Sequence, residues 1–192
     1  MGSEMCIRDR GKITLSELSY SPPRPVKVKV AQEHGAIGHV IRGWGPPEYE
    51  VISKSEAKWV WGNPTIDDMD DFPKIPALLI TKKDGLYLEE LTKKGKVRVR
   101  LKARVDTGWR KLIIPVTTIE GKEEPEKFIL VGGHYDSWGA GVTCNAVGVA
   151  LLLELARVLA KHKDGLRRSV KIAWWPGHEM IYLGSTFFND YF

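Results

Sequence analysis

The sequence is poor in cysteine and lacks a long run of apolar residues. Only Cys6 and Cys144 occur among its 192 residues, so we expect no disulfide framework and favour a reducing, cytoplasmic compartment over an oxidising one. The longest apolar stretch, residues 146–153, is interrupted by Gly148 and ended by Glu154. This stretch is too short to cross a bilayer, so we expect neither a transmembrane segment nor a membrane partner.

The N-terminal residues lack the apolar core of a signal peptide. Residues 1–10, Met-Gly-Ser-Glu-Met-Cys-Ile-Arg-Asp-Arg, show no periodicity either. We interpret them as a leader that does not belong to the fold. This interpretation leaves the native N-terminus, and any targeting signal on it, open.

The sequence also lacks a strong excess of either positive or negative charge. The chain has 29 Lys and Arg against 24 Asp and Glu, a net charge of +5 at pH 7, and both signs are interspersed as on a solvated surface. In residues 96–105, basic and apolar residues alternate, which predicts a half-buried strand with a cationic face. No aromatic platform accompanies this face, so we favour the strand and expect no nucleic-acid partner.

The hydrophobic content and the pattern of predicted helices and strands indicate a globular chain of two domains. Hydrophobic residues make up 43% of it, enough for a core. The first domain is expected at residues 11–104 and the second at residues 105–192, which opens with a strand or hairpin arm at residues 107–120. In the first domain we expect strands at residues 12–15, 36–41 and 75–80, and helices at residues 26–33 and 84–94.

Two apolar runs in the second domain each end in glycine and then in polar residues. Residues 128–131 lead through two glycines to His134, and residues 170–175 lead through Pro-Gly to His178 and Glu179. A helix-length segment at residues 146–162 lies between them, and its expected core face has helical spacing: Val149, Leu152, Leu153, Ala156 and Leu159 or Ala160. Two strands joined by a helical crossover form a βαβ unit, whose parallel strands bind ligands at their carboxyl ends.

The spacing of these polar residues indicates a metal site. Residues at i and i+2 of an extended segment share a face, so Asp136 can accept one imidazole N–H of His134 while the other ring nitrogen faces a metal. A small-residue loop at residues 139–146 brings Cys144 toward the same edge. Cys, His and Glu are all zinc ligands, so His134, Cys144 and Glu179 are the candidate metal ligands.

The same stretch resembles the co-catalytic zinc aminopeptidases of peptidase clan MH, a superfamily that includes glutamate carboxypeptidases and the transferrin receptor. The resemblance lies in residues 132–138 (GGHYDSW), 143–157 (TCNAVGVALLLELAR), 167–175 (RRSVKIAWW) and 183–185 (LGS). It implies an α/β domain with a mixed, largely parallel sheet and flanking helices. It also implies up to two zinc ions, a peptide substrate and a glutamate that activates water.

Carried over residue by residue, the resemblance implies a role for each candidate. His134 and Glu179 match metal ligands, and Asp136 matches the carboxylate that orients His134. Cys144 stands where the family has an aspartate that bridges both metals, and His178 stands where it has the glutamate base. A thiolate can bind or bridge zinc, and an imidazole can accept a proton near neutral pH. His178 and Asp136 are therefore the candidate catalytic residues.

Two interpretations of the function stay open. The first is a zinc-dependent exopeptidase, present as an incomplete and inactive chain, because the family's remaining ligands follow well after the position of Glu179. The second is a non-catalytic binding module that keeps the peptidase fold, as in the transferrin receptor. Trp138 is the candidate for the wall of a substrate pocket, whereas Trp174 and Trp175 are expected in the core. The sequence does not predict an oligomeric state.

Residues 11–104 resemble the protease-associated domain that is often inserted in this peptidase family. The resemblance rests on residues 34–38 (HGAIG) and 75–80 (IPALLI), and on their position before the catalytic stretch. It implies a smaller α+β domain that shapes substrate access and carries no catalytic residue.

Overall fold

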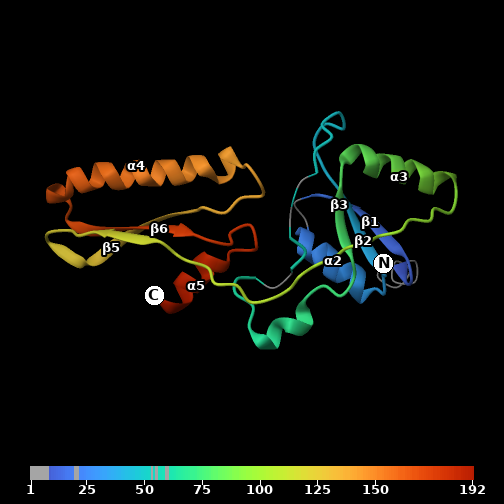
Figure 1. Ribbon diagram of the computed structural model, residues 1–192, viewed down its shortest axis with the longest axis horizontal. Coiled ribbons are helices and arrows are strands. Elements are labelled where there is room, and N and C mark those ends of the chain that lie inside the picture. The colour runs from blue at the N-terminus through green and yellow to red at the C-terminus, as the bar shows by residue number, and fades with distance from the viewer. Residues whose placement is uncertain (1–8, 20–21, 53, 55, 59–60) are drawn as a thin grey trace. The chain divides into compact units, whose positions relative to one another are not determined.

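The chain forms two compact units in the computed structural model, which describes residues 9–19, 22–52, 54, 56–58 and 61–192 (Figure 1). Unit 1 takes its described residues from Met1–Val60 and Thr65–Gly108, and unit 2 takes its residues from Trp61–Pro64 and Trp109–Phe192. The division at residue 108 and the domain boundary expected after residue 104 fall in one connecting segment without helix or strand. The assignment of Trp61–Pro64 to unit 2 was not expected.

Unit 1 is a parallel three-stranded sheet with two helices. Its strands lie in the order β1-β2-β3. The three strands and two helices expected between residues 12 and 94 are confirmed within a few residues. The elements are β1 (Ile13–Glu17), α2 (Arg24–Glu33), β2 (Gly38–Arg42), a 3-10 helix (Ile66–Asp71), β3 (Ala77–Ile80) and α3 (Lys82–Lys94).

The central strand β2 packs against a helix on each face of the sheet. Ile41 lies in a core cluster with Leu18 and with Val28 of α2. Its neighbour Arg42 points to the other face, where a Cβ atom on Gly85 of α3 would lie 2.1 Å from Arg42 Cβ. Successive residues of a strand face opposite sides, so α2 and α3 cover opposite faces of this sheet (Figure 1).

The prediction of a strand at residues 96–105 is wrong. This segment has neither helix nor strand, and its basic side chains are exposed. Leu101 does pack closely, because a Cβ atom on Gly38 would lie 2.8 Å from Leu101 Cδ1. Alternation of apolar and basic residues makes a strand only where a neighbouring strand supplies backbone hydrogen bonds. In the described part of the chain, no strand pairs with this segment.

Unit 2 confirms the mixed α/β fold. The sheet order is β4-β6-β5, with β4 antiparallel and β5 parallel to β6. The strand expected at residues 107–120 is limited to β4, and helix α5 was not expected. The elements are β4 (Val116–Ile119), β5 (Glu124–His134), a π-type turn (Val142–Ala146), α4 (Val147–Lys161), a 3-10 turn (Lys163–Gly165), β6 (Arg168–Trp175) and α5 (Leu183–Tyr191).

The core of unit 2 lies between α4 and the sheet. Leu152 of α4 packs with Val170 and the fully buried Ile172 of β6, and α5 lies on the other side of the sheet (Figure 1). The expected core positions of Trp174 and Trp175 are confirmed: Trp174 packs against this cluster, and the Trp175 ring centroid lies 5.1 Å from that of Phe188. Full burial of a side chain such as Ile172 contributes about 1.5–3 kcal/mol.

One core position expected on α4 is wrong. Leu153 is 57% exposed, whereas Leu155, Ala156 and Leu159 pack against the core. Each residue of an α-helix turns by about 100°, so the side chain that follows the buried Leu152 points away from the sheet. The inward stripe therefore continues at i+3, i+4 and i+7 from Leu152.

The apolar character of α4 extends through the turn before it. Together these residues, Val142–Lys161, are long and apolar enough to cross a membrane by length and composition. The core helix of a soluble domain passes the same test, so one such helix is weak evidence of a membrane protein. The expectation of no transmembrane segment stays a prediction.

A buried histidine lies at the centre of the unit 1 sheet. His39 is 3% exposed, and its Nδ1 and Nε2 lie 2.6 Å from Thr14 Oγ1 and 3.0 Å from Ser16 Oγ, respectively. Burial, together with the nearby charge of Lys27, lowers the pKa of His39 to about 4, while the charge of Asp9 opposes the shift. The imidazole is therefore neutral near pH 7.

We expect unit 1 to lose stability as the pH falls from 6.5 to about 4. In this window the unfolded chain, with an ordinary pKa of 6.5, binds a proton that folded His39 excludes, and the difference amounts to about 3 kcal/mol. Hydrogen-exchange protection of the β2 amides at several pH values measures the effect. In the His39→Gln variant this part of the pH dependence should disappear, and an unchanged dependence would contradict the assignment to His39.

Candidate metal centre

The carboxyl ends of β5 and β6 meet at one edge of the sheet. His134, the last residue of β5, is in register with Trp175, the last residue of β6, and the amide of Tyr135 donates to the Trp175 carbonyl at 3.0 Å. Because β5 and β6 are parallel, the segments that follow them both begin at this edge of the sheet. The side chains that follow the two strands are therefore brought together, as the βαβ pattern predicted.

The carboxylate of Asp136 connects these two strand ends. Its Oδ1 accepts the backbone N–H of His178 at 3.1 Å, and its Oδ2 accepts the N–H of Glu179 at 2.9 Å. The same Oδ1 lies 3.4 Å from His134 Nδ1. One carboxylate thus fixes the turn that carries His178 and Glu179 and lies beside the ring of His134.

The ring of His134 presents one nitrogen to Cys144. Its Nδ1 lies 3.0 Å from the backbone carbonyl of Asp136, and because a carbonyl oxygen only accepts, Nδ1 carries the proton. Nε2 then keeps its lone pair and lies 3.6 Å from Cys144 Sγ. The orientation expected from the Asp136 carboxylate is thus provided largely by the backbone oxygen of the same residue.

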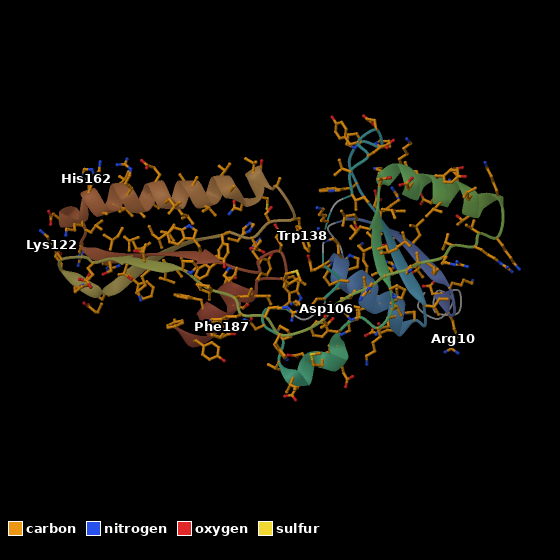
Figure 2. All side chains as sticks on the ribbon, in the orientation of Figure 1. Arg10, Asp106, Lys122, Trp138, His162 and Phe187 are labelled. Atoms are coloured by element: carbon orange, nitrogen blue, oxygen red, sulfur yellow. The ribbon has the colours of Figure 1, made fainter. Side chains whose placement is uncertain are left out.

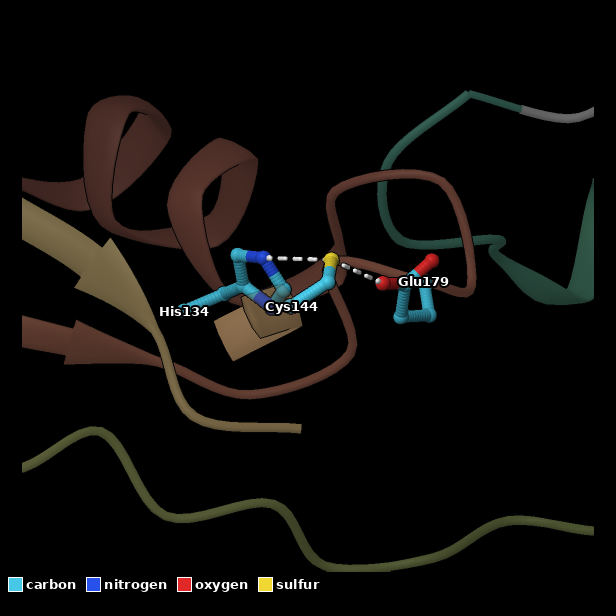
Figure 3. Close-up of side chains that lie close together, drawn as sticks. All are labelled: His134, Cys144 and Glu179. Atoms are coloured by element: carbon cyan, nitrogen blue, oxygen red, sulfur yellow. Dashed lines mark hydrogen bonds between the residues drawn. The ribbon is translucent and has the colours of Figure 1, made fainter. Parts of the chain in front are cut away.

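His134, Cys144 and Glu179 form the one cluster of potential metal ligands found among the described residues (Figure 3). Their donor atoms all lie within 4.8 Å of one another. Nitrogen, thiolate sulfur and carboxylate oxygen are all zinc donors, and three protein ligands leave a fourth tetrahedral position open. The three side chains therefore fit a zinc ion chemically, and their role as ligands stays a prediction.

The thiol of Cys144 is held in its protonated form in this arrangement. Its Sγ donates to Glu179 Oε1 at 3.1 Å. This hydrogen bond is the largest cause that raises the pKa of Cys144, and burial and the charges of Glu179 and Asp136 act in the same direction. A metal ion that bound here would have to displace the thiol proton.

Small residues bring the Cys144 loop back to β5. A Cβ atom on Gly141 would lie 2.1 Å from Ser137 Oγ and 2.4 Å from the Cys144 carbonyl oxygen. Asn145 donates its side-chain N–H to the backbone carbonyl of His134 at 3.0 Å. A larger residue at position 141 would therefore separate Cys144 from the cluster.

His178 lies beside the cluster rather than in it. Its ring stacks on that of His134 with a centroid distance of 4.0 Å and an interplanar angle of 14°. The rings of His178 and Tyr182 form a T-shaped contact with a centroid distance of 4.8 Å. The structure thus places the candidate base next to a candidate ligand.

Trp138 contacts the cluster directly, which the sequence did not predict. Its indole N–H donates to Glu179 Oε2 at 2.9 Å, so one oxygen of Glu179 is occupied by Trp138 and the other faces Cys144. A hydrogen bond across 41 positions leaves no pattern in a single sequence. Trp138 was expected in a pocket wall, and here it orients a candidate ligand.

The turn after the cluster is strained. Ile181 and Tyr182 have φ angles of 62° and 60°, in the left-handed region that disfavours side chains with a Cβ atom. The cost is about 1–2 kcal/mol for each residue. Gly177, which opens the turn, has a φ of 64° that glycine adopts freely. Packing must hold Ile181 and Tyr182 in this conformation.

His162 lies at the end of α4 that is remote from the cluster. It caps the C-terminal end of α4. Figure 2 shows His162 and Lys122 at one end of unit 2 and Trp138 at the other. A substitution of His162 can therefore serve as a control that does not touch the cluster.

Unit 2 thus combines an α/β fold with a cluster of potential metal ligands at the strand ends, and comparison with known proteins finds similar peptidases. The model of peptidase family M28 matches residues 116–190. Chicken transferrin receptor protein 1 is 33% identical over 110 residues, which cover 54% of this chain and 14% of that protein. Rat aminopeptidase NAALADL1 is 40% identical over 78 residues, which cover 38% of this chain and 10% of that protein.

The fold is also similar to that of a solved enzyme. The crystal structure of BSAP, a zinc aminopeptidase from Bacillus subtilis, matches with a TM-score of 0.60 and 22% sequence identity, over 96% of this chain and 41% of that one. This chain therefore spans well under half the length of these proteins. The match to peptidase family M28 thus covers residues 116–190, which run from β4 into α5.

We expect Trp138→Phe to weaken zinc binding about tenfold, because partners that hydrogen-bond to a ligand contribute about 10–100-fold to metal affinity. The substitution keeps an aromatic ring and removes the N–H that orients Glu179. Zinc titration by calorimetry measures the effect. Trp109→Phe, at a tryptophan that is 67% exposed, is the matched control and should bind zinc as the unaltered protein does. Equal affinities for all three proteins would contradict the role of Trp138.

Proposed function

We propose that His134, Cys144 and Glu179 bind a zinc ion, and that the intact protein is a zinc-dependent exopeptidase of the aminopeptidase type. The observation that carries this proposal is the convergence of the three donor atoms within 4.8 Å inside the segment matched by the M28 family. Relatives and a structural neighbour that are aminopeptidases support it.

Each residue would contribute a defined property to this chemistry. A bound zinc ion polarises a carbonyl group and lowers the pKa of water. His134 offers its Nε2 lone pair, and Asp136 holds the tautomer that exposes it. His178 is our candidate proton acceptor, because its imidazole lies against the His134 ring and imidazole titrates near neutral pH.

The described donors provide for one ion. His134, Cys144 and Glu179 supply three ligand atoms, which is the number that catalytic zinc sites commonly take from the protein. A second ion, as the aminopeptidase resemblance implies, would need ligands besides these. The peptide substrate belongs to this proposal as well.

We propose further that residues 11–104 are a protease-associated domain. Its support is a separate small unit in which three parallel strands are covered by helices, and its position before the M28 segment. In this assignment the unit shapes access to the peptidase domain and contributes no catalytic group.

A binding module without catalysis is the second candidate. It is favoured by Cys144 and His178, which replace the two carboxylates of the zinc aminopeptidases, and by the likeness to transferrin receptor protein 1. In this alternative the cluster would keep the fold of the strand ends without hydrolysing a peptide bond. The geometry of the donor atoms favours the first candidate.

Metal content and hydrolysis separate the two candidates. The intact protein should be purified from zinc-containing medium, its zinc content measured, and its activity tested on amino acid p-nitroanilides with and without a chelator. One zinc per chain and chelator-sensitive hydrolysis would support the peptidase. Stoichiometric zinc without hydrolysis would leave a metal-binding module, and the absence of both would overturn the proposed function.

We expect Cys144→Asp combined with His178→Glu to raise zinc affinity about tenfold at pH 7, because a carboxylate is already ionised whereas the hydrogen-bonded Cys144 thiol must first lose its proton. Each single variant should be titrated as well, since His178 also contacts His134 and Tyr182. His162→Glu is the control for the added carboxylate and should leave zinc affinity unchanged. If zinc affinity does not rise in the double variant, the match of Cys144 and His178 to the two carboxylates of the zinc aminopeptidases is wrong.

A further inference from the structure

Four residues from the middle of the unit 1 sequence belong to unit 2. The segment Trp61–Pro64 is flanked on both sides by residues of unit 1. Its backbone and side chains bind the turn that follows the metal cluster: the amide of Gly62 donates to the Ile181 carbonyl at 2.9 Å, and Asn63 Nδ2 donates to the Leu183 carbonyl at 2.7 Å. We call residues 61–64 the clamp segment.

The two hydrogen bonds of the clamp segment enclose the strained part of the turn. Ile181 and Tyr182 both have positive φ angles, and the two acceptor carbonyls belong to Ile181 itself and to Leu183, the residue after Tyr182. Bonds at these positions oppose relaxation of the turn toward an ordinary conformation. Strain held in this way beside a cluster of reactive side chains is typical of functional sites.

Aromatic rings continue the contact from the clamp segment to the candidate ligands. The Trp61 ring stacks on Tyr182 with a centroid distance of 5.8 Å and an interplanar angle of 18°. Tyr182 contacts His178 at 4.8 Å, and His178 stacks on His134 at 4.0 Å. Each ring limits the rotation of the next, so the position of Trp61 bears on the orientation of His134.

The fit between the clamp segment and α5 is close. A Cβ atom on Gly62 would lie 2.7 Å from Thr186 Oγ1 and 2.9 Å from Thr186 Cβ, and Gly62 has a φ of 66°. Only glycine fits this position without moving the segment away from the helix. The contact is therefore specific in shape as well as in hydrogen bonding.

We propose that the clamp segment positions the metal cluster: it holds the strained turn at Ile181 and Tyr182, and through the rings of Tyr182 and His178 it fixes the orientation of His134. It supplies no ligand. The inference rests on the proposed function for its consequence, which is metal affinity, whereas the orientation of the rings is a property of the metal-free protein.

Cobalt(II) binding tests this proposal, because cobalt replaces zinc and its visible and thiolate charge-transfer bands report ligand geometry. Trp61→Ala should bind Co²⁺ about tenfold more weakly, in the range of other groups that orient ligands, and its bands should differ from those of the unaltered protein. Trp61→Phe keeps a ring and should recover most of the affinity. Trp109→Ala removes an exposed tryptophan of the same unit and should have no effect.

Milder substitutions keep the test informative where Trp61→Ala lowers the amount of folded protein. Asn63→Ala removes one hydrogen bond to the turn, and Gly62→Ala displaces the segment from Thr186. Both should weaken Co²⁺ binding in the same direction. Metal affinity and band positions equal to those of the unaltered protein, in variants whose thermal unfolding shows a folded unit 2, would overturn the positioning role.

Proton NMR of the metal-free protein separates this inference from the proposed function. Trp61→Ala should shift the ring resonances of His178 and His134, because the Tyr182 ring that contacts His178 is released. Failure of the unaltered protein to bind Co²⁺ would overturn the metal site, while shifted histidine resonances would still support positioning of the rings. Unchanged resonances would overturn the role of the clamp segment.

Discussion

The arrangement of unit 2 depends on the carboxylate of Asp136. Two adjacent strands end in register at His134 and Trp175, and the chains beyond them would be free to diverge. Asp136 prevents this because its two oxygens accept the amides of His178 and Glu179. The loop after β5 and the turn after β6 are thereby joined, and an imidazole and a carboxylate meet at one point of the sheet edge.

The donor set at this edge differs in chemistry from a cluster of carboxylates. A thiol hydrogen-bonded to a carboxylate keeps its proton, in line with the raised pKa of Cys144, so a metal ion that bound here would release that proton. The ring of His178 stacks on that of His134 and meets the ring of Tyr182 in a T-shaped contact. The site is thus ordered by aromatic packing as well as by hydrogen bonds.

The parts of the site that the sequence predicted are those that follow from local pattern. Apolar runs ended by glycine located both strand ends, and the spacing of His134 and Asp136 placed them beside each other. The prediction of a strand at residues 96–105 was wrong, because alternation of basic and apolar residues describes a side-chain pattern and does not supply a neighbouring strand for backbone pairing. The predicted core position of Leu153 was wrong, because α4 has apolar residues on several sides and its sequence does not identify the side that faces the sheet.

The contacts that complete the site join residues far apart in the sequence. Trp138 reaches Glu179, and Trp61 reaches Tyr182 across the whole of the intervening unit 1 sequence and most of unit 2. The amino-acid sequence by itself determined the βαβ unit, the zinc-type donors and the resemblance to a peptidase domain, since these depend on periodicity and residue type. Only the tertiary structure decided which groups orient those donors, because a hydrogen bond or ring contact between distant segments depends on how the chain is folded and leaves no local pattern.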